Sequence, residues 1–170
     1  MKGSHKMRLK TVDLSQNGDR KIVLKRSGLT RILESWIDIN VPVSDVWDAL
    51  VHIESWAEWN SFIPLVEGKL EVGNTIKIKV VSPGMKEMFF EPTIYEIEEN
   101  QKISWGGGFL LFVYKGIHEF ILKEIDDTTT RFRQIEKFQG PIVYLMKSMI
   151  QKTAIGYLNM NEEFKDFLEH

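Results

Sequence analysis

The chain changes from a strand-like to a helix-like pattern near residue 140, and this change limits the fold more than any other feature. Before that point, most segments are short and suit β-strands. After it, apolar residues recur every three or four positions from Ile142 to Phe167, as they do on one face of a helix. A helix of about 26 residues would be about 39 Å long, enough to cross a whole sheet.

Seven strand-like segments precede this helix. Turn signals such as Ser82-Pro83-Gly84 separate them, and such short connections favour antiparallel neighbours in chain order, so we expect a meander. In one segment Ile76, Ile78 and Val80 alternate with lysines, which predicts one buried and one wet face. The segments are 31–40, 63–71, 75–81, 86–97, 102–109, 111–124 and 129–139.

Two short helices are expected after the first strand. Ser44 is a suitable N-cap for the first, and Val46, Trp47 and Leu50 form its apolar side. A second short turn is expected over 53–59. The predicted class is therefore α+β, with a seven-stranded curved antiparallel sheet, two short helices after strand 1, and the long C-terminal helix packed in the concave face.

The chain divides into three parts. Residues 1–30 form an N-terminal extension that is turn-prone over 13–19, in which only 21–25 would make a strand. Residues 31–167 form the domain. Residues 168–170 resemble the start of a purification tag and are left out of the functional interpretation.

Composition excludes several function classes. The chain has no cysteine, which excludes disulfides and thiolate chemistry and fits a cytoplasmic location. A formal net charge of −2 gives no general attraction to nucleic acid or anionic membrane. No stretch approaches the roughly 18 apolar residues of a membrane span, and no apolar core follows the basic N-terminus as it would in a secretory signal.

No motif indicates a metal or cofactor. The four histidines are scattered without a metal-ligand spacing, so we expect no metal and no cofactor. Gly106-Gly107-Gly108 is not followed by the Lys-Ser/Thr of a phosphate loop and is interpreted as a hairpin turn or bulge.

The inward positions of the sheet carry large apolar side chains, and the helix adds several methionines. Flexible methionine suits surfaces that adapt to varied apolar partners, which favours an apolar cavity. Gly156 lies on the apolar stripe of the helix, where it costs about 1 kcal/mol relative to alanine. This indicates a close approach to the backbone there. The alternative is a tightly packed core in which Gly156 makes room for an aromatic ring.

Five motifs, in this order along the chain, resemble those of the SRPBCC superfamily, which includes START, Bet v 1-like and polyketide cyclase proteins. They are INVPVSDVWDAL at 39–50, ESWAEWNSFIP at 54–64, GIHEFIL at 116–122, TRFRQIEKFQG at 130–140 and GYLNMNEEFK at 156–165. The resemblance implies the helix-grip fold with a groove between sheet and helix. It is less specific for function, because this fold serves transport, sensing, cyclisation and chaperone regulation.

His118 and Glu136 are the most notable polar candidates, because they lie on strands expected to be neighbours and on the face shared with Phe120 and Phe138. Such a pair would orient a ligand or act as acid and base; the alternative is a structural hydrogen bond. The residues expected to line the binding site are Trp59, Asn60, Phe90, Tyr95, Trp105, His118, Phe120, Gln134, Glu136, Phe138, Met149, Thr153, Gly156, Tyr157 and Met160. For Trp59 and Asn60 we favour a structural role.

Three functions are therefore compared. The leading one is binding of a hydrophobic small molecule, lipid, sterol-like or polyketide-like, by a monomer or weak homodimer. The second is an enzyme of the polyketide cyclase or dehydratase type, with His118 and Glu136 as its acid and base. The third is a protein-interaction module, which a large exposed apolar patch outside the groove would favour.

Overall fold

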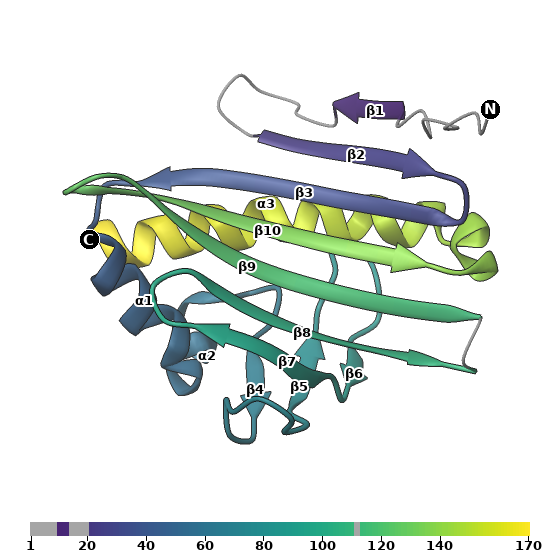
Figure 1. The fold of residues 1–170 in the computed structure, drawn as a ribbon, viewed down its shortest axis with the longest axis horizontal. Coiled ribbons are helices and arrows are strands. Elements are labelled where there is room, and N and C mark those ends of the chain that lie inside the picture. The colour runs from purple at the N-terminus through teal and green to yellow at the C-terminus, as the bar shows by residue number, and fades with distance from the viewer. Residues whose placement is uncertain (1–9, 14–20, 111–112) are drawn as a thin grey trace, which may run out of the picture.

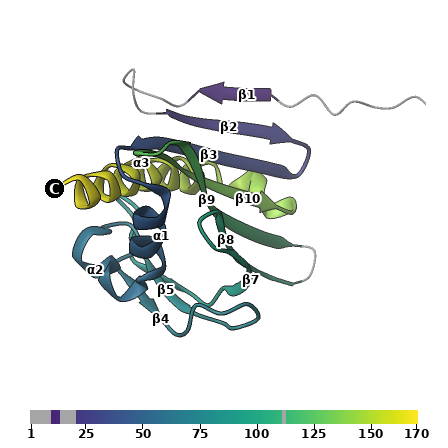
Figure 2. The same cartoon turned by 60° about the vertical axis from the view of Figure 1, so that its left-hand side comes forward.

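The computed structural model of the protein describes residues 10–13, 21–110 and 113–170. A curved sheet runs along one side of a long helix, and the short helices lie near one end of that helix (Figures 1 and 2). The strands are β1 Lys10–Asp13, β2 Lys21–Ser27, β3 Thr30–Ile39, β4 Leu65–Glu67, β5 Lys77–Val80, β6 Met88–Phe90, β7 Thr93–Glu98, β8 Lys102–Phe109, β9 Tyr114–Asp126 and β10 Thr129–Gln139. The helices are α1 Val43–Val51, α2 Trp56–Trp59 and α3 Lys147–Glu169, with 3₁₀ helices η1 Ile53–Ser55 and η2 Pro141–Leu145.

The predicted α+β class, with an antiparallel sheet and a long C-terminal helix, is confirmed. The main sheet has seven strands in the order β1-β2-β3-β10-β9-β8-β7, and β4, β5 and β6 form a separate three-stranded sheet. The expected meander of 31–139 is therefore wrong in its pairing, because β3 pairs with β10. The predicted strand 86–97 divides at Pro92, which has no N–H to donate to a ladder.

The N-terminal part contributes to the main sheet. Strand β2 pairs with β3 along its whole length, and its Ile22 and Leu24 side chains are buried in the core. The sheet therefore starts within the segment interpreted as an extension, and β2 is longer than the expected strand 21–25. Residues 14–19 of the turn-prone segment 13–19 lie outside the described residues, as does the basic stretch 1–9.

Helix α1 begins one residue earlier than its predicted cap. The carbonyl of Pro42 accepts hydrogen bonds from the amides of Asp45 and Val46, both at 3.1 Å. Ser44 lies inside the first turn, and its hydroxyl contacts the carboxylate of Asp45 at 3.2 Å, so it does not cap the helix. The expected apolar side is buried, as predicted.

Helix α3 begins at Lys147 and not at Ile142, because Pro141–Leu145 forms the 3₁₀ helix η2. Its C-terminal half packs in the core, where the Phe164 ring stacks on Trp59 with centroids 4.5 Å apart. The helix continues to Glu169, whose carboxylate accepts a hydrogen bond from the amide of Asn40 at 2.6 Å. Leu168 packs against the core, so two of the three residues compared with a tag take part in the fold.

Candidate functional site

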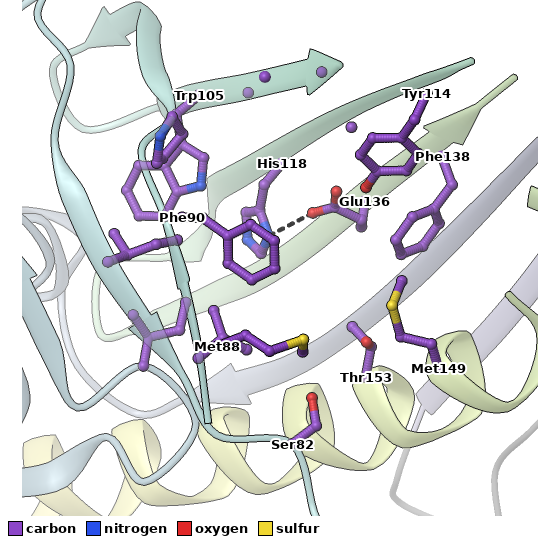
Figure 3. Close-up of a pocket in the computed structure, with 18 of the residues that line it drawn as sticks. Ser82, Met88, Phe90, Trp105, Tyr114, His118, Glu136, Phe138, Met149 and Thr153 are labelled. Atoms are coloured by element: carbon purple, nitrogen blue, oxygen red, sulfur yellow. Dashed lines mark hydrogen bonds and ion pairs between the residues drawn. The ribbon is translucent and has the colours of Figure 1, made fainter. Parts of the chain in front are cut away.

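A cavity of about 300 Å³ lies between the main sheet, the short sheet and the first half of α3. Strands β8, β9 and β10 form one side of it, α3 forms a second, and β5 with β6 forms the third (Figure 3). Phe90 and Phe109 line the cavity and are about half exposed, which places its opening beside them. Most of the wall is apolar, contributed by Phe62, Ile63, Ile78, Val80, Met88, Phe90, Pro92, Trp105, Phe109, Phe138 and Met149.

The loop between β5 and β6 faces α3 across the cavity. Lys152 of α3 donates a hydrogen bond to the carbonyl of Gly84 in this loop at 2.7 Å, and that bond is exposed to solvent. Ser82 of the same loop lines the cavity, and its buried hydroxyl has no hydrogen-bond partner within the described part of the chain. The cavity therefore has one polar atom on this side that a bound molecule would satisfy.

A cluster of three polar side chains interrupts the apolar wall on the opposite side. His118 and Glu136 are directly paired in the register of β9 and β10, and His118 Nδ1 lies 2.9 Å from Glu136 Oε2. The hydroxyl of Tyr157, from α3, donates to the same carboxylate oxygen at 3.0 Å and lies 2.7 Å from His118 Nδ1. The cluster thus joins the sheet to the helix.

The hydrogen bonds of this cluster leave one carboxylate oxygen free for a ligand. If Nδ1 carries the proton, both His118 and Tyr157 donate to Oε2 of Glu136, and every donor at this point is satisfied. No described residue donates to Oε1 of Glu136, which belongs to a side chain that lines the cavity. A donor group on a bound molecule would find its acceptor there.

Gly116 gives this carboxylate its space. A Cβ at Gly116 would lie 2.6 Å from the hydroxyl oxygen of Tyr114 and 3.1 Å from Oε1 of Glu136. The absence of a side chain therefore allows the Tyr114 hydroxyl and the free carboxylate oxygen to occupy the same corner of the cavity. Burial, and then the nearby charge of Glu136, raise the pKa of Tyr114 and of Tyr157, so both phenols remain protonated donors at neutral pH.

The family model "Polyketide cyclase / dehydrase and lipid transport" matches residues 30–156. This span covers most of the chain and contains β3 to β10 and half of α3. The chain belongs to this family. No curated protein sequence matches it.

Three solved structures are similar in fold to this member of the polyketide cyclase and lipid transport family. The Zhui aromatase/cyclase from Streptomyces sp. R1128 has a TM-score of 0.68 at 11% identity, over 82% of this chain and 94% of that one. Truncated norcoclaurine synthase from Thalictrum flavum has 0.64 at 12% identity, over 83% and 95%. Ara h 8.0201 has 0.62 at 17% identity, over 82% and 98%. These identities support a shared fold only. The predicted SRPBCC membership is confirmed.

Eight of the residues predicted from the sequence lie on the cavity wall of this family member. They come from β6, β8, β9, β10 and α3, which are far apart in the chain and meet around the cavity. The eight are Phe90, Trp105, His118, Glu136, Phe138, Met149, Thr153 and Tyr157.

Four of the other predicted residues are packed in the core instead. Trp59 stacks on Phe164, and the side-chain oxygen of Asn60 accepts hydrogen bonds from the amides of Phe62 and Ile63 at 3.1 and 2.8 Å. Both side chains therefore make contacts within the core. Phe120 and Met160 are fully buried, and neither lines the cavity.

The last three predicted residues are also outside the wall, for three different reasons. Gln134 donates to the side-chain oxygen of Asn161 at 2.7 Å and so ties β10 to α3. Tyr95 follows a register shift in β7 and is exposed on the outer surface. Gly156 packs against the ring of Phe62, as the alternative interpretation of that glycine predicted.

Sequence reasoning missed part of the wall. Gly106, Gly107 and Gly108 lie in the regularly paired strand β8 and line the cavity, so their interpretation as a hairpin turn or bulge is wrong. Ser82, Met88 and Glu91 also line the cavity and belong to the short sheet or its loops. The periodicity of the sequence does not indicate that this sheet folds over the cavity. Tyr114 also lines the cavity and was not among the residues expected to line the binding site.

The described residues contain no group of three or more metal-binding side chains, and none of their helices is long and apolar enough to cross a bilayer. A second hollow, of about 360 Å³, lies between β3 and the outer side of α3. Its wall includes Lys21, Asp38, Glu162 and Lys165, and Asp38 is already paired with Arg131. The apolar cavity is therefore the better candidate for a ligand site.

The raised pKa values of Tyr114 and Tyr157 predict a loss of stability at alkaline pH. Above about pH 10 these side chains ionise in the unfolded chain but not in the folded one, so the free energy of unfolding falls by about 1.4 kcal/mol per pH unit for each tyrosine. Below pH 10 their contribution is fully present. Urea unfolding at pH 9, 10 and 11 measures this slope.

Substitutions test whether these two tyrosines cause the loss of stability at alkaline pH. A Tyr114→Phe, Tyr157→Phe double variant is expected to show a shallower fall, whereas Tyr144→Phe, at an exposed tyrosine, is expected to leave the slope unchanged. Lys102, whose pKa is raised by Glu96 and Glu119, contributes equally in all variants. Equal slopes in the double variant and the unmodified chain would contradict the interpretation.

Proposed function

We propose that the protein binds a compact hydrophobic molecule that carries a hydroxyl group. The apolar wall, with Trp105, Phe138 and Met149, would contact the body of the molecule, and Glu136 would accept a hydrogen bond from the hydroxyl. A volume of about 300 Å³ is at the lower end for small-molecule sites, which favours a small ring system over a long-chain lipid. Sterol-like and polyketide-like fragments fit this description.

The free oxygen of Glu136 is the observation that carries the proposal. His118 is 5% exposed, and together with Tyr157 it occupies the other carboxylate oxygen, so the carboxylate is held in one orientation. A hydrogen bond to a charged acceptor in an apolar surrounding is worth about 1.5–3 kcal/mol, or roughly 10- to 150-fold in affinity. A ligand that lacks a donor would leave this oxygen desolvated and unpaired.

A matched pair of probes tests the proposal. 2-Naphthol is expected to bind at least tenfold more tightly than 2-methoxynaphthalene, which has nearly the same shape but no donor. Tryptophan fluorescence reports binding because Trp105 lines the cavity, and native mass spectrometry gives the stoichiometry. Equal affinities for the two probes would contradict the role of Glu136, and absence of binding by both would contradict an apolar ligand site.

Glu136→Gln is expected to remove most of the preference for 2-naphthol. The glutamine keeps the shape and still accepts from His118 and Tyr157, but it presents an amide NH₂ to the cavity in place of the carboxylate oxygen. The ratio of the two affinities should fall to about threefold or less, since the charge-assisted bond is lost. Glu119→Gln is the matched control, because Glu119 lies on β9, the strand paired with β10, and forms an ion pair with Lys102 at 2.9 Å.

The same cluster also favours a second candidate, an enzyme of the cyclase or dehydratase type. Glu136 would remove a proton from a carbon next to a carbonyl, and a tyrosine hydroxyl would donate to the carbonyl oxygen. In that case a polyketide-like substrate is converted by the unmodified protein, and Glu136→Gln abolishes turnover while the affinity for the substrate is largely kept. Unchanged turnover in this variant would exclude the assignment of Glu136 as the base.

A further inference from the structure

Large apolar side chains are exposed together at the end of the molecule where α3 begins. They come from the β2–β3 turn, the end of β8 with Leu110, and η2, and Figures 1 and 2 both show these segments along one end. Leu145 is 86% exposed and Leu110 is 76% exposed. The members of this apolar end are Leu29, Phe109, Leu110, Tyr144 and Leu145.

Contacts between the three segments keep the apolar end together. The amide of Gly140, which precedes η2, donates to the carbonyl of Leu29 at 3.1 Å, and the guanidinium of Arg31 lies 5.1 Å from the centre of the Tyr144 ring. The Phe109 ring stacks on Tyr114 with centroids 5.4 Å apart, and Gly140 packs against the start of β9, where a Cβ at Gly140 would lie 3.2 Å from the Cα of Tyr114. The exposed side chains are thus presented by connected backbone and do not depend on independent loops.

The segments that build this end are basic. Residues 24–33, 103–118 and 137–161 contain no aspartate or glutamate, although the whole chain has a net charge of −2. Their basic residues are Lys25, Arg26, Arg31, Lys115, Lys137, Lys147 and Lys152. Among the described residues only Lys25 of these forms an ion pair, with Glu34 at 2.6 Å. The other six have no acidic partner in the described part of the chain, and of these Arg31 and Lys152 donate to backbone carbonyls.

This end also borders the cavity opening. Phe109 belongs both to the apolar end and to the cavity wall, and Met149 of the wall lies two residues after Lys147 on α3. The acidic residue at the opening is Glu91, which follows β6 on the far side. A surface bound to the apolar end would therefore lie next to the entrance.

We propose that this end docks on the surface of an anionic lipid bilayer. Leu110 and Leu145 are the most exposed of these side chains, which suits insertion into a fluid interface, and Tyr144 has the amphipathic ring that is enriched at such interfaces. The surrounding lysine and arginine side chains would contact anionic headgroups. The proposal does not rest on the proposed ligand, because docking is measured with the cavity empty.

Vesicle flotation tests it with the full chain. At 50 mM salt the protein is expected to float with vesicles of equal parts phosphatidylglycerol and phosphatidylcholine, and at least tenfold less with phosphatidylcholine alone. Raising the salt to 500 mM should reduce binding strongly, since the attraction of headgroups for surface charges is screened. Leu110→Asp combined with Leu145→Asp should reduce binding at least tenfold, and Lys147→Glu at least fivefold.

Controls use exposed positions outside this end. Val72→Asp changes an apolar side chain that is 61% exposed in the β4–β5 turn, and Lys69→Glu reverses a charge near it; both are expected to bind like the unmodified chain. Thermal melting confirms that each variant is folded. Glu136→Gln should bind vesicles normally, which separates this result from the ligand proposal.

Three results would overturn the proposal. One is no flotation with anionic vesicles at 50 mM salt. Another is that Val72→Asp and Lys69→Glu reduce vesicle binding as much as the substitutions at the apolar end do. A third is a concentration-dependent dimer, detected by analytical ultracentrifugation, that Leu145→Asp abolishes while vesicles leave the protein unbound, because the apolar end would then contact a second copy of the chain.

Discussion

Replacing Gly156 with alanine is expected to lower the free energy of unfolding by about 2–3 kcal/mol, the cost of overpacking a filled core. At an ordinary position in a helix the same change would raise stability by about 1 kcal/mol. The sign is reversed here because a Cβ at Gly156 would overlap two carbons of the Phe62 ring and lie 3.0 Å from a third. The ring cannot move away freely, since it also packs edge-on against Tyr157 with centroids 5.4 Å apart. Urea unfolding measures the change.

A double-mutant cycle shows whether Phe62 is the cause. In a Phe62→Leu background, Gly156→Ala should cost less than half as much, because the smaller side chain leaves room for the methyl group. Ser148→Ala, at an exposed position of the same helix, is the control and should change stability by less than about 0.5 kcal/mol. A rise in stability on Gly156→Ala would show that the ring and helix separate easily.

Thr153→Phe is expected to abolish uptake of 2-naphthol, with at least a tenfold loss of affinity. Thr153 precedes Gly156 by three residues, but its side chain lines the cavity and does not enter the packed core. A phenyl ring at this position would occupy space that the ligand needs, while the surrounding wall stays in place. The change in unfolding free energy should be below about 1.5 kcal/mol, as for substitutions that fill a void without strain.

The comparison variant is Thr153→Ser, which keeps the hydroxyl and removes one methyl group from the wall. It should bind 2-naphthol within about threefold of the unmodified protein, because the volume it adds is small. Tryptophan fluorescence titration gives both affinities. If Thr153→Phe binds as well as Thr153→Ser, the ligand does not occupy the cavity between α3 and the sheet.

Much of the fold could be predicted because the main elements follow simple periods. The helical spacing from Ile150 to Phe164 and the alternation in β9 and β10 each define one buried face. The pairing of β3 with β10 could not be derived in this way, because both short-range and long-range partners satisfy an alternating pattern. Strand β2 was expected only over 21–25 and within an extension, since seven residues with two buried side chains give only a weak signal.

The candidate site could be predicted to a similar extent. His118 and Glu136 were identified because alternation places them on the same face as Phe120 and Phe138, and the register confirms that they are directly paired. Gly156 shows the limit of this reasoning. A gap in an apolar stripe indicates close approach of another group, but sequence alone does not distinguish a ligand from the ring of Phe62.

The hydrogen bond between Lys152 and Gly84 has a consequence for the exchange of a bound molecule. Among the described residues it is the side-chain hydrogen bond that joins α3 to the β5–β6 loop, and it is exposed to water. Separating the loop from the helix would therefore not require the Trp59–Phe164 stack or the pairing of β9 with β10 to break. Local openings of this kind occur far more often than global unfolding. Entry and release of a ligand can thus take place without unfolding of the domain.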